Sequence, residues 1–148
     1  MTYERITSEL DKDIQYLNTI LEMPEISRYI SVDKANFWRY VTSTKNVFYY
    51  KVYDEDALVG AVQLELSGGV LYMDIMVIPE FQRQGIGTSV IRDIQSGVLP
   101  LSFERIEISI DERNIASIKL FENVGFEFIS HDDELLNYIY IKRAKTTL

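Results

Sequence analysis

The chain has 148 residues, of which 47% are hydrophobic, and a formal net charge of −8 at pH 7; this suits one folded domain over residues 1–148 and argues against disorder. Cysteine is absent, which excludes disulfides, thiolate zinc sites and cysteine nucleophiles, and the acidic balance argues against a nucleic-acid partner. No apolar run approaches the roughly 20 residues that span a bilayer, and the polar start lacks the pattern of a secretory signal, so we expect a cytoplasmic protein without a membrane partner.

The first half of the chain predicts two helices followed by three strands. The first helix shows apolar residues at helical spacing and ends at Pro24, and Asp33 is a candidate cap for the second. The strands are β-branched, aromatic or alternating in pattern. In chain order, these elements are helices over 8–23 and 32–41 and strands over 47–53, 58–66 and 70–78.

The second half predicts alternating helices and strands. Pro100 stops one helix and Gly125 stands at the C-terminal cap of the next. The expected elements are a helix over 87–98, a strand over 103–110, a helix over 114–124 and closing strands over 126–129 and 135–141. This order predicts an α/β (α+β) fold in which helices pack on a mixed sheet.

Two glycines, Gly85 and Gly87, lie one residue apart between a predicted strand and a predicted helix. A helix start has free N–H groups and a partial positive charge, and glycine lets a ligand approach the backbone. We therefore expect a pyrophosphate cradle here. A Walker loop requires a lysine after the second glycine, and a Rossmann fingerprint requires a third glycine where Val90 stands, so both patterns fail.

Read as Gln82-x-x-Gly85-x-Gly87, the stretch resembles the acetyl-CoA signature of the GNAT N-acetyltransferase superfamily, (Gln or Arg)-x-x-Gly-x-(Gly or Ala). About 30 residues later, NIASIKLFENVGFE resembles that family's second motif, which begins with Asn and ends with Gly-Phe. Each motif alone has a purely structural explanation: a strand–helix turn that uses glycine for the first, and a helix with a glycine at its C-terminal cap for the second. Neither explains why both motifs occur in this order. The resemblance covers the segment from Val70 to Glu127.

The resemblance implies a mostly antiparallel mixed sheet with a central parallel strand pair that splays, flanked by about four helices. It also implies acetyl-CoA as co-substrate and no metal. Arg83 is either a phosphate partner or a solvated loop residue. The residues expected to bind coenzyme A are Met76, Val77, Gln82, Arg83, Gln84, Gly85, Ile86, Gly87, Thr88, Asn114, Ser117 and Phe121.

One position departs from the family pattern. We expect Asn114 both to cap its helix and to hold the pantetheine chain. Seven residues later, many relatives carry a tyrosine that protonates the departing thiolate. Phe121 stands there and has no proton to donate. The thiolate then leaves unprotonated, takes a proton from water or uses another of the ten tyrosines.

Asp74 is the candidate general base, because it is the one charge in the strand predicted over 70–78. A carboxylate buried there would need partners, and such residues concentrate at functional sites. A structural carboxylate bonded to a nearby loop is the other interpretation. Glu65 and Glu107 on the flanking strands are the backups.

Two further groups stand out. His131, the one histidine, falls in the polar turn HDDE, which makes a zinc site improbable; the acidic residues of this turn either attract a cationic acceptor or are simply solvated. The other group is aromatic, and it falls where the resemblance places the acceptor wall, although most of it should be core: Tyr29, Phe37, Trp38 and Tyr40.

The sequence therefore predicts an acetyltransferase that moves an acetyl group from acetyl-CoA to a primary amine by direct attack in a ternary complex, since no covalent nucleophile is apparent. The acceptor is a small amine, an antibiotic or a peptide or protein N-terminus, and a homodimer stays open. The alternatives are a non-catalytic acyl-CoA-binding module and a phosphate or nucleotide binder.

Overall fold

The computed structural model describes residues 1–33 and 35–142. In this part of the chain the strands form a seven-stranded sheet in the order β1-β2-β3-β4-β5-β7-β6. Every neighbouring pair is antiparallel except β4 and β5, which are parallel. The strands are β1 (Thr2–Arg5), β2 (Val47–Asp54), β3 (Ala57–Ser67), β4 (Val70–Val77), β5 (Arg105–Asp111), β6 (Glu127–Asp132) and β7 (Leu135–Ile141).

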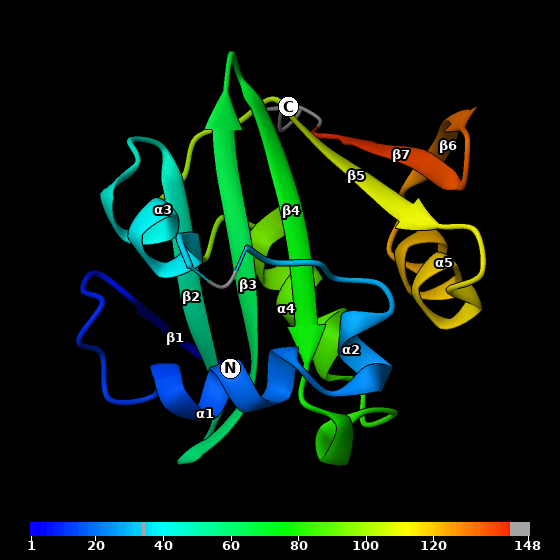
Figure 1. The fold of residues 1–148 in the computed structure, drawn as a ribbon. Helices are drawn as coiled ribbons and strands as arrows, with labels where there is room; N and C mark the ends of the chain where they lie inside the picture. Colours follow the sequence, from blue (N-terminus) through cyan, green and yellow to red (C-terminus); the bar gives the residue numbers. More distant parts are fainter. Residues whose placement is uncertain (34, 143–148) are drawn as a thin grey trace.

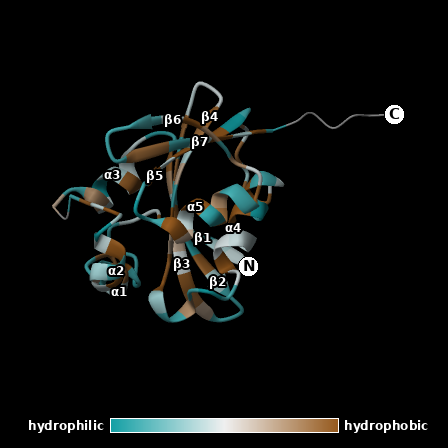
Figure 2. Ribbon diagram, turned by 90° about the vertical axis from the view of Figure 1, so that its right-hand side faces the viewer, coloured by the Kyte–Doolittle hydropathy of each residue, from teal (hydrophilic) through white to brown (hydrophobic). Residues whose placement is uncertain are grey.

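Helices cover both faces of the sheet (Figures 1 and 2). Three lie on one face: α1 (Ile14–Leu21), α2 (Pro24–Ser27) and α3 (Phe37–Ser43). Two lie on the other face: α4 (Ile86–Gln95) and α5 (Ile115–Asn123). The predicted mixed, mostly antiparallel sheet with a parallel pair is confirmed, and α2 adds one helix to the expected four.

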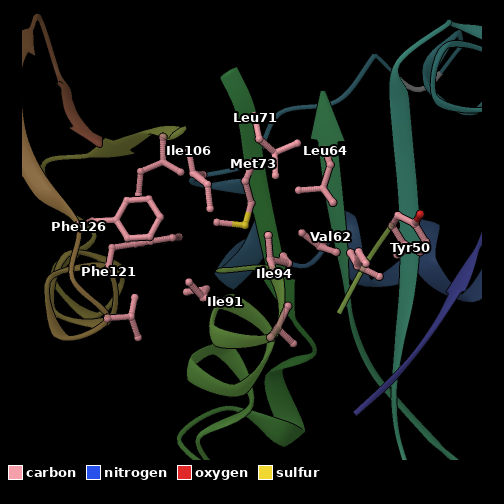
Figure 3. Close-up of a cluster of buried hydrophobic side chains, with 14 of the residues drawn as sticks. Tyr50, Val62, Leu64, Leu71, Met73, Ile91, Ile94, Ile106, Phe121 and Phe126 are labelled. Atoms are coloured by element: carbon pink, nitrogen blue, oxygen red, sulfur yellow. The ribbon is translucent and has the colours of Figure 1, made fainter. Parts of the chain in front are cut away.

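One hydrophobic core fills the space between the sheet and the α4–α5 layer (Figure 3). Val90, Ile91 and Ile94 of α4 are almost fully buried there, because this amphipathic helix turns one stripe toward the strands. Each such side chain contributes about 1.5–3 kcal/mol relative to an exposed one. On the opposite face, Leu17 of α1 and Trp38 of α3 belong to a second core.

Lys51 of β2 controls where the first helix begins. Its side chain is fully buried, and its Nζ lies 3.0 Å from Asp11 Oδ1, 2.7 Å from Asp13 Oδ2 and 3.3 Å from Glu4 Oε1. A buried ammonium is costly unless it is paired, so the segment before α1 stays on the sheet. The prediction of a helix over 8–23 is therefore wrong for its first part: residues 8–13 form turns, and Leu10 is 92% exposed.

Other boundaries differ from the predictions for local reasons. Pro24 does not merely stop a helix; it occupies the first turn of α2, where its missing N–H costs nothing. The helix expected over 32–41 begins only at Phe37, because Asp33 Oδ1 accepts from Ala35 N (3.2 Å) and closes the turn before it. No strand was predicted over the residues of β1, which pairs with β2 at the edge of the sheet.

The parallel strands β4 and β5 are paired over only three residue pairs, from Val70↔Arg105 to Tyr72↔Glu107. β4 remains paired with β3 as far as Val77, and β5 remains paired with β7 over its whole length. The two strands consequently diverge beyond Tyr72, as Figure 1 shows. The expected splay of the central pair is confirmed.

Gly60 of β3 stands opposite the diverging end of β4. A Cβ at this position would lie 2.4 Å from the backbone oxygen of Met76. Glycine inside a strand often marks such a close backbone approach. The path of β4 beside the gap therefore requires glycine at position 60.

We expect Gly60→Ala to lower the free energy of unfolding by about 1–3 kcal/mol, because β4 must move away from the added methyl group. Urea denaturation measures this loss, and Ser67→Ala at the exposed end of the same strand is the control. An unchanged denaturation midpoint for Gly60→Ala would contradict the close contact.

Candidate active site

A cavity of about 700 Å³ opens where β4 and β5 part. Its walls come from both strands, the loop before α4, the start of α5 and the segment 25–30 around α2. Most of the residues predicted to bind a cofactor line it: Met76, Val77, Gln82, Arg83, Gly85, Ile86, Gly87, Thr88, Asn114, Ser117 and Phe121. Gln84 does not line it; its side chain donates to the backbone oxygen of Glu80 (3.5 Å).

The loop from Gln82 to Gly85 turns the chain from β4 into α4. Gln82 Nε2 donates to the backbone oxygen of Val77 (3.0 Å), which ties the loop to the end of the strand. Arg83 and Gly85 both have positive φ, at 65° and 79°. The side chain of Arg83 is exposed at the rim of the cavity.

The amino end of α4 presents free backbone donors to this cavity. The first helical hydrogen bond runs from Ser89 N to Gly85 O (3.1 Å), so the amides of the preceding three residues have no acceptor within the helix. No side chain caps this end. Free amides and the helix dipole together favour an anion.

Gly85 and Gly87 serve different purposes. Gly85 adopts the left-handed conformation that the turn into α4 requires, and a Cβ there would meet open space. A Cβ on Gly87 would lie 3.0 Å from Leu120 Cδ2 of α5. Gly87 therefore also lets α4 pack closely against α5, and because it lines the first cavity as well, the approach of a ligand to its backbone stays a prediction.

Residues Asn114 to Phe121 form another wall of the first cavity. Asn114 Oδ1 accepts from Ser117 N (3.2 Å), which confirms the predicted helix cap. Phe121 is 3% exposed and packs edge-on against Phe126 at 5.1 Å between ring centroids. Figure 3 shows these two rings together in the core.

A second cavity of about 440 Å³ adjoins the first. Glu107, Asn137 and Tyr72 line it. Four residues line both cavities: Met73, Asp74, Ile108 and Ser109. The gap between β4 and β5 thus connects two spaces, and Asp74 stands where they meet.

Asp74 is exposed to solvent in this gap, so the prediction of a buried carboxylate is wrong. No hydrogen bond or ion pair engages its carboxylate among residues 1–33 and 35–142. The pKa of Asp74 is nevertheless raised, first because the surrounding protein displaces much of its hydration and then because Glu65 is negatively charged. Both effects suit a carboxylate that accepts a proton.

The two backup carboxylates lie on the same face of the sheet as Asp74, but in different surroundings. Glu65 accepts hydrogen bonds from the Tyr40 hydroxyl and from Gln63 Nε2 (3.3 Å), and it lines neither cavity. Glu107 lines the second cavity, with Arg105 Nε 3.8 Å from its Oε1. The structure therefore brings Asp74 and Glu107 together and assigns Glu65 to a hydrogen-bonded cluster.

Other predicted residues fall outside these cavities. His131 is in β6 rather than in a turn, and its Nε2 lies 2.9 Å from Glu112 Oε2. Phe37 and Trp38 pack edge-on with Tyr49 in the second core, whereas Tyr40 is 41% exposed, so only part of the aromatic group is core. Within the described residues, no cluster of three or more acidic or histidine side chains is arranged to hold a metal ion.

Sequence reasoning missed the contribution of the α2 region. Glu25 and Arg28 line the first cavity, and so does Arg113 from the loop before α5. Tyr29, one of the aromatic residues expected at the acceptor wall, also lines this cavity. Pro24, read only as a helix stop, was the available signal, since proline also begins helices. None of the helices in the described part of the chain combines the length and apolar character needed to cross a bilayer.

The sequence profile of the acetyltransferase (GNAT) family matches residues 14–126. This match includes every residue that lines the first cavity. The chain belongs to the acetyltransferase (GNAT) family. It is therefore an acyltransferase.

Solved structures agree with this GNAT fold. A domain from Methanocaldococcus jannaschii DSM 2661 superposes with a TM-score of 0.79 at 19% identity, over 95% of this chain and 97% of that one. The spermidine N-acetyltransferase from Vibrio cholerae in complex with CoA and spermine gives 0.78 at 15%, over 95% of each chain. The Campylobacter jejuni N-acetyltransferase PseH in complex with acetyl coenzyme A gives 0.77 at 12%, over 96% and 100%. A comparison with curated protein sequences finds no significant match.

We expect Gly87→Val to lower the free energy of unfolding of this GNAT chain by about 1–3 kcal/mol, because the branched side chain meets Leu120. Leu120→Ala should relieve part of this loss, with a coupling energy of about 0.5–3 kcal/mol in a double-mutant cycle. Ser89→Val, at an exposed position of α4, is the control. A Gly87→Val variant as stable as the parent would refute the packing role.

We expect Asp74→Asn to be more stable than the parent at neutral pH. A carboxyl whose pKa is higher in the folded state destabilises that state when it is ionised. The advantage should shrink as the pH falls through the folded pKa and vanish below the unfolded value of about 3.9. Thermal melts across pH measure this effect.

Asp111 provides a control of opposite sign. The Arg113 side chain and backbone N–H lower the pKa of Asp111 to about 2, so this carboxylate stabilises the folded state above the unfolded pKa. Asp111→Asn should therefore be less stable than the parent at neutral pH, and the difference should disappear as the pH falls toward about 2. Equal shifts for both variants would contradict these assignments.

Proposed function

We propose that this GNAT acyltransferase moves the acetyl group of acetyl-CoA to a primary amine by direct attack within a ternary complex. The observation that carries the proposal is the gap between β4 and β5, which joins two cavities at Asp74. One cavity has the donors for an anionic cofactor, and the other has the carboxylates for a cationic acceptor. The cofactor and the amine therefore reach the same point from different sides.

The first cavity fits coenzyme A. The free amides at the start of α4 would receive the pyrophosphate, and Arg83 at the rim would add positive charge. The backbone of Met76 and Val77 lies beyond the last β4–β5 pair, so β5 offers no partner to the N–H and C=O groups that face the gap; of these groups, Val77 O already accepts from Gln82 Nε2. Such groups bind the pantetheine arm and, through an N–H, the developing oxyanion.

The second cavity fits the amine. Asp74 and Glu107 line it, and none of the described residues that line it is basic. An acceptor ammonium would be drawn to these carboxylates and would lose a proton to Asp74, directly or through water. The spermidine N-acetyltransferase of Vibrio cholerae, which is similar in fold, was solved with CoA and spermine, and this supports a cationic acceptor.

Release of free CoA from acetyl-CoA, measured over a panel of polyamines, aminoglycosides and peptides with free N-termini, tests the activity. Amine-dependent release with formation of the acetylated product is the expected result. Tight CoA binding without any amine-dependent release would instead identify a non-catalytic acyl-CoA-binding module.

We expect Thr88→Glu to weaken CoA binding by about tenfold or more at low salt, because its carboxylate would repel the pyrophosphate. The same change should leave the fold intact, since an acidic residue in the first turn of a helix is stabilising. Thr88→Gln, which has the same shape without the charge, is the matched control. Equal affinities of the two variants by calorimetry would remove the α4 start from the cofactor site.

We expect Asp74→Asn to lower kcat by about 10²–10⁴-fold, the usual contribution of a general base. The loss should diminish at high pH, where the amine deprotonates unaided, and CoA affinity should stay nearly unchanged. Glu107→Gln, the other carboxylate of the second cavity, should mainly raise the KM of cationic acceptors. An Asp74→Asn enzyme with the parent rate at every pH would exclude Asp74 as the base.

A further inference from the structure

A positioned proton donor would assist breakdown of the thioester, and the side chain at position 121 does not supply one. Phe121 has no hydroxyl, and its ring is buried against Phe126. A free thiolate is a poorer leaving group than a thiol, and a positioned acid typically contributes about 10²–10⁴-fold. The donor has to line the first cavity, where the thioester would lie.

We propose that Tyr29 protonates the departing thiolate; this assignment rests on the function proposed above. Tyr29 lines the first cavity together with Met76, Val77 and Phe121. It is the one phenol among the described residues that do so. Phenols and thiols have ordinary pKa values of about 10 and about 8.5, close enough for efficient proton transfer.

The other tyrosines are occupied or lie elsewhere. Four donate their hydroxyls to carboxylates away from this cavity: Tyr3, Tyr40, Tyr53 and Tyr138. Tyr72 lines only the second cavity, and the rest lie in the cores or on α1.

The aliphatic hydroxyls of the cavity are weaker candidates. Serine and threonine are much weaker acids than a phenol. Ser109 Oγ already donates to Asn137 Oδ1 (2.6 Å). Thr88 lies at the start of α4, where the pyrophosphate would bind.

The fold holds Tyr29 at the mouth of the gap. Its N–H donates to the backbone oxygen of Ile26 (3.1 Å), and Ile26 is anchored in the core beneath α1 and α3. Figure 1 shows α2, which Tyr29 follows, beside the end of β4 on the side of α5. Arg113, from the loop before α5, lines the same cavity.

The proposed step balances in atoms and charge. The neutral amine forms the C–N bond, and the C–S bond breaks with its electron pair on sulfur. The Tyr29 hydroxyl then gives its proton to sulfur, yielding the CoA thiol and a tyrosinate. After the attack, the nitrogen releases one proton through Asp74 to solvent, and the tyrosinate recovers one proton from solvent.

The test compares the parent with Tyr29→Phe, Phe121→Tyr and the double variant, using acetyl-CoA with hydroxylamine and with the best amine of the panel. Tyr29→Phe should lower kcat by about 10²-fold or more and leave the KM for acetyl-CoA unchanged. A general acid must be protonated to act, so the parent rate should fall at high pH, and this fall should be absent in Tyr29→Phe. Adding Phe121→Tyr should restore most of the lost rate, because it returns a phenol to the cavity. Tyr16→Phe, at an exposed position of α1, is the control.

A readout without an acceptor uses bound CoA itself. A hydroxyl that donates to sulfur stabilises the thiolate, so Tyr29→Phe should raise the pKa of the bound CoA thiol, measured by thiolate absorbance. Parent kcat and an unchanged thiol titration in Tyr29→Phe would overturn the assignment, as would a loss of rate that Phe121→Tyr does not rescue. The proposed function fails separately, when the parent itself releases no CoA with any amine.

Discussion

The parting of β4 from β5 is the constraint on which the rest of the site depends. Each strand keeps its other partner along its length, β3 for β4 and β7 for β5, so the sheet divides into two stiff halves joined by three residue pairs. Backbone groups that face the gap have lost their strand partners and require water or a ligand. The α4–α5 layer packs across one face of both halves and closes the core beneath the gap. The gap is therefore a binding surface made of backbone, and its position follows from where pairing ends.

Strand pairing beyond the hairpins was not visible in residue patterns. A run of apolar residues located β4, and its single carboxylate marked Asp74, but such a run does not reveal which neighbour a strand loses. The splay was expected only from the GNAT resemblance. Gly85 and Gly87 illustrate the same limit: both belong to one motif, yet one meets a conformational demand and the other a contact with Leu120. A local pattern records that glycine is needed, whereas the reason depends on a helix that comes later in the chain.

Long-range charge pairing explains the other differences between sequence and structure. Residues 8–13 satisfy a helical pattern, but pairing of Asp11 and Asp13 with the buried Lys51 outweighs the gain from one more helical turn. Asp74 was read as buried because its strand is apolar, whereas the gap admits solvent on that side. Glu65 shares its face but is held by Tyr40 and Gln63. These distinctions depend on side chains from other helices and strands, and one sequence does not reveal which of these residues meet.

Charge is distributed unevenly across the gap, and this organises the proposed chemistry. The first cavity combines Arg28, Arg83 and Arg113 with the free amides of α4, and its lining also includes the carboxylates of Glu25, Asp74 and Asp111, of which Asp111 pairs with Arg113. The second cavity has carboxylates and, among its described lining residues, no basic side chain. A polyanionic cofactor and a cationic amine would thus be attracted to different sides. In the proposed reaction, the amine arrives as an ammonium and has to lose a proton before it attacks. Because the pKa of Asp74 is raised at the junction of the cavities, this carboxylate is a better proton acceptor than one in water. In the proposed mechanism, loss of hydration around Asp74, more than the charge of its neighbours, prepares this carboxylate to activate the acceptor.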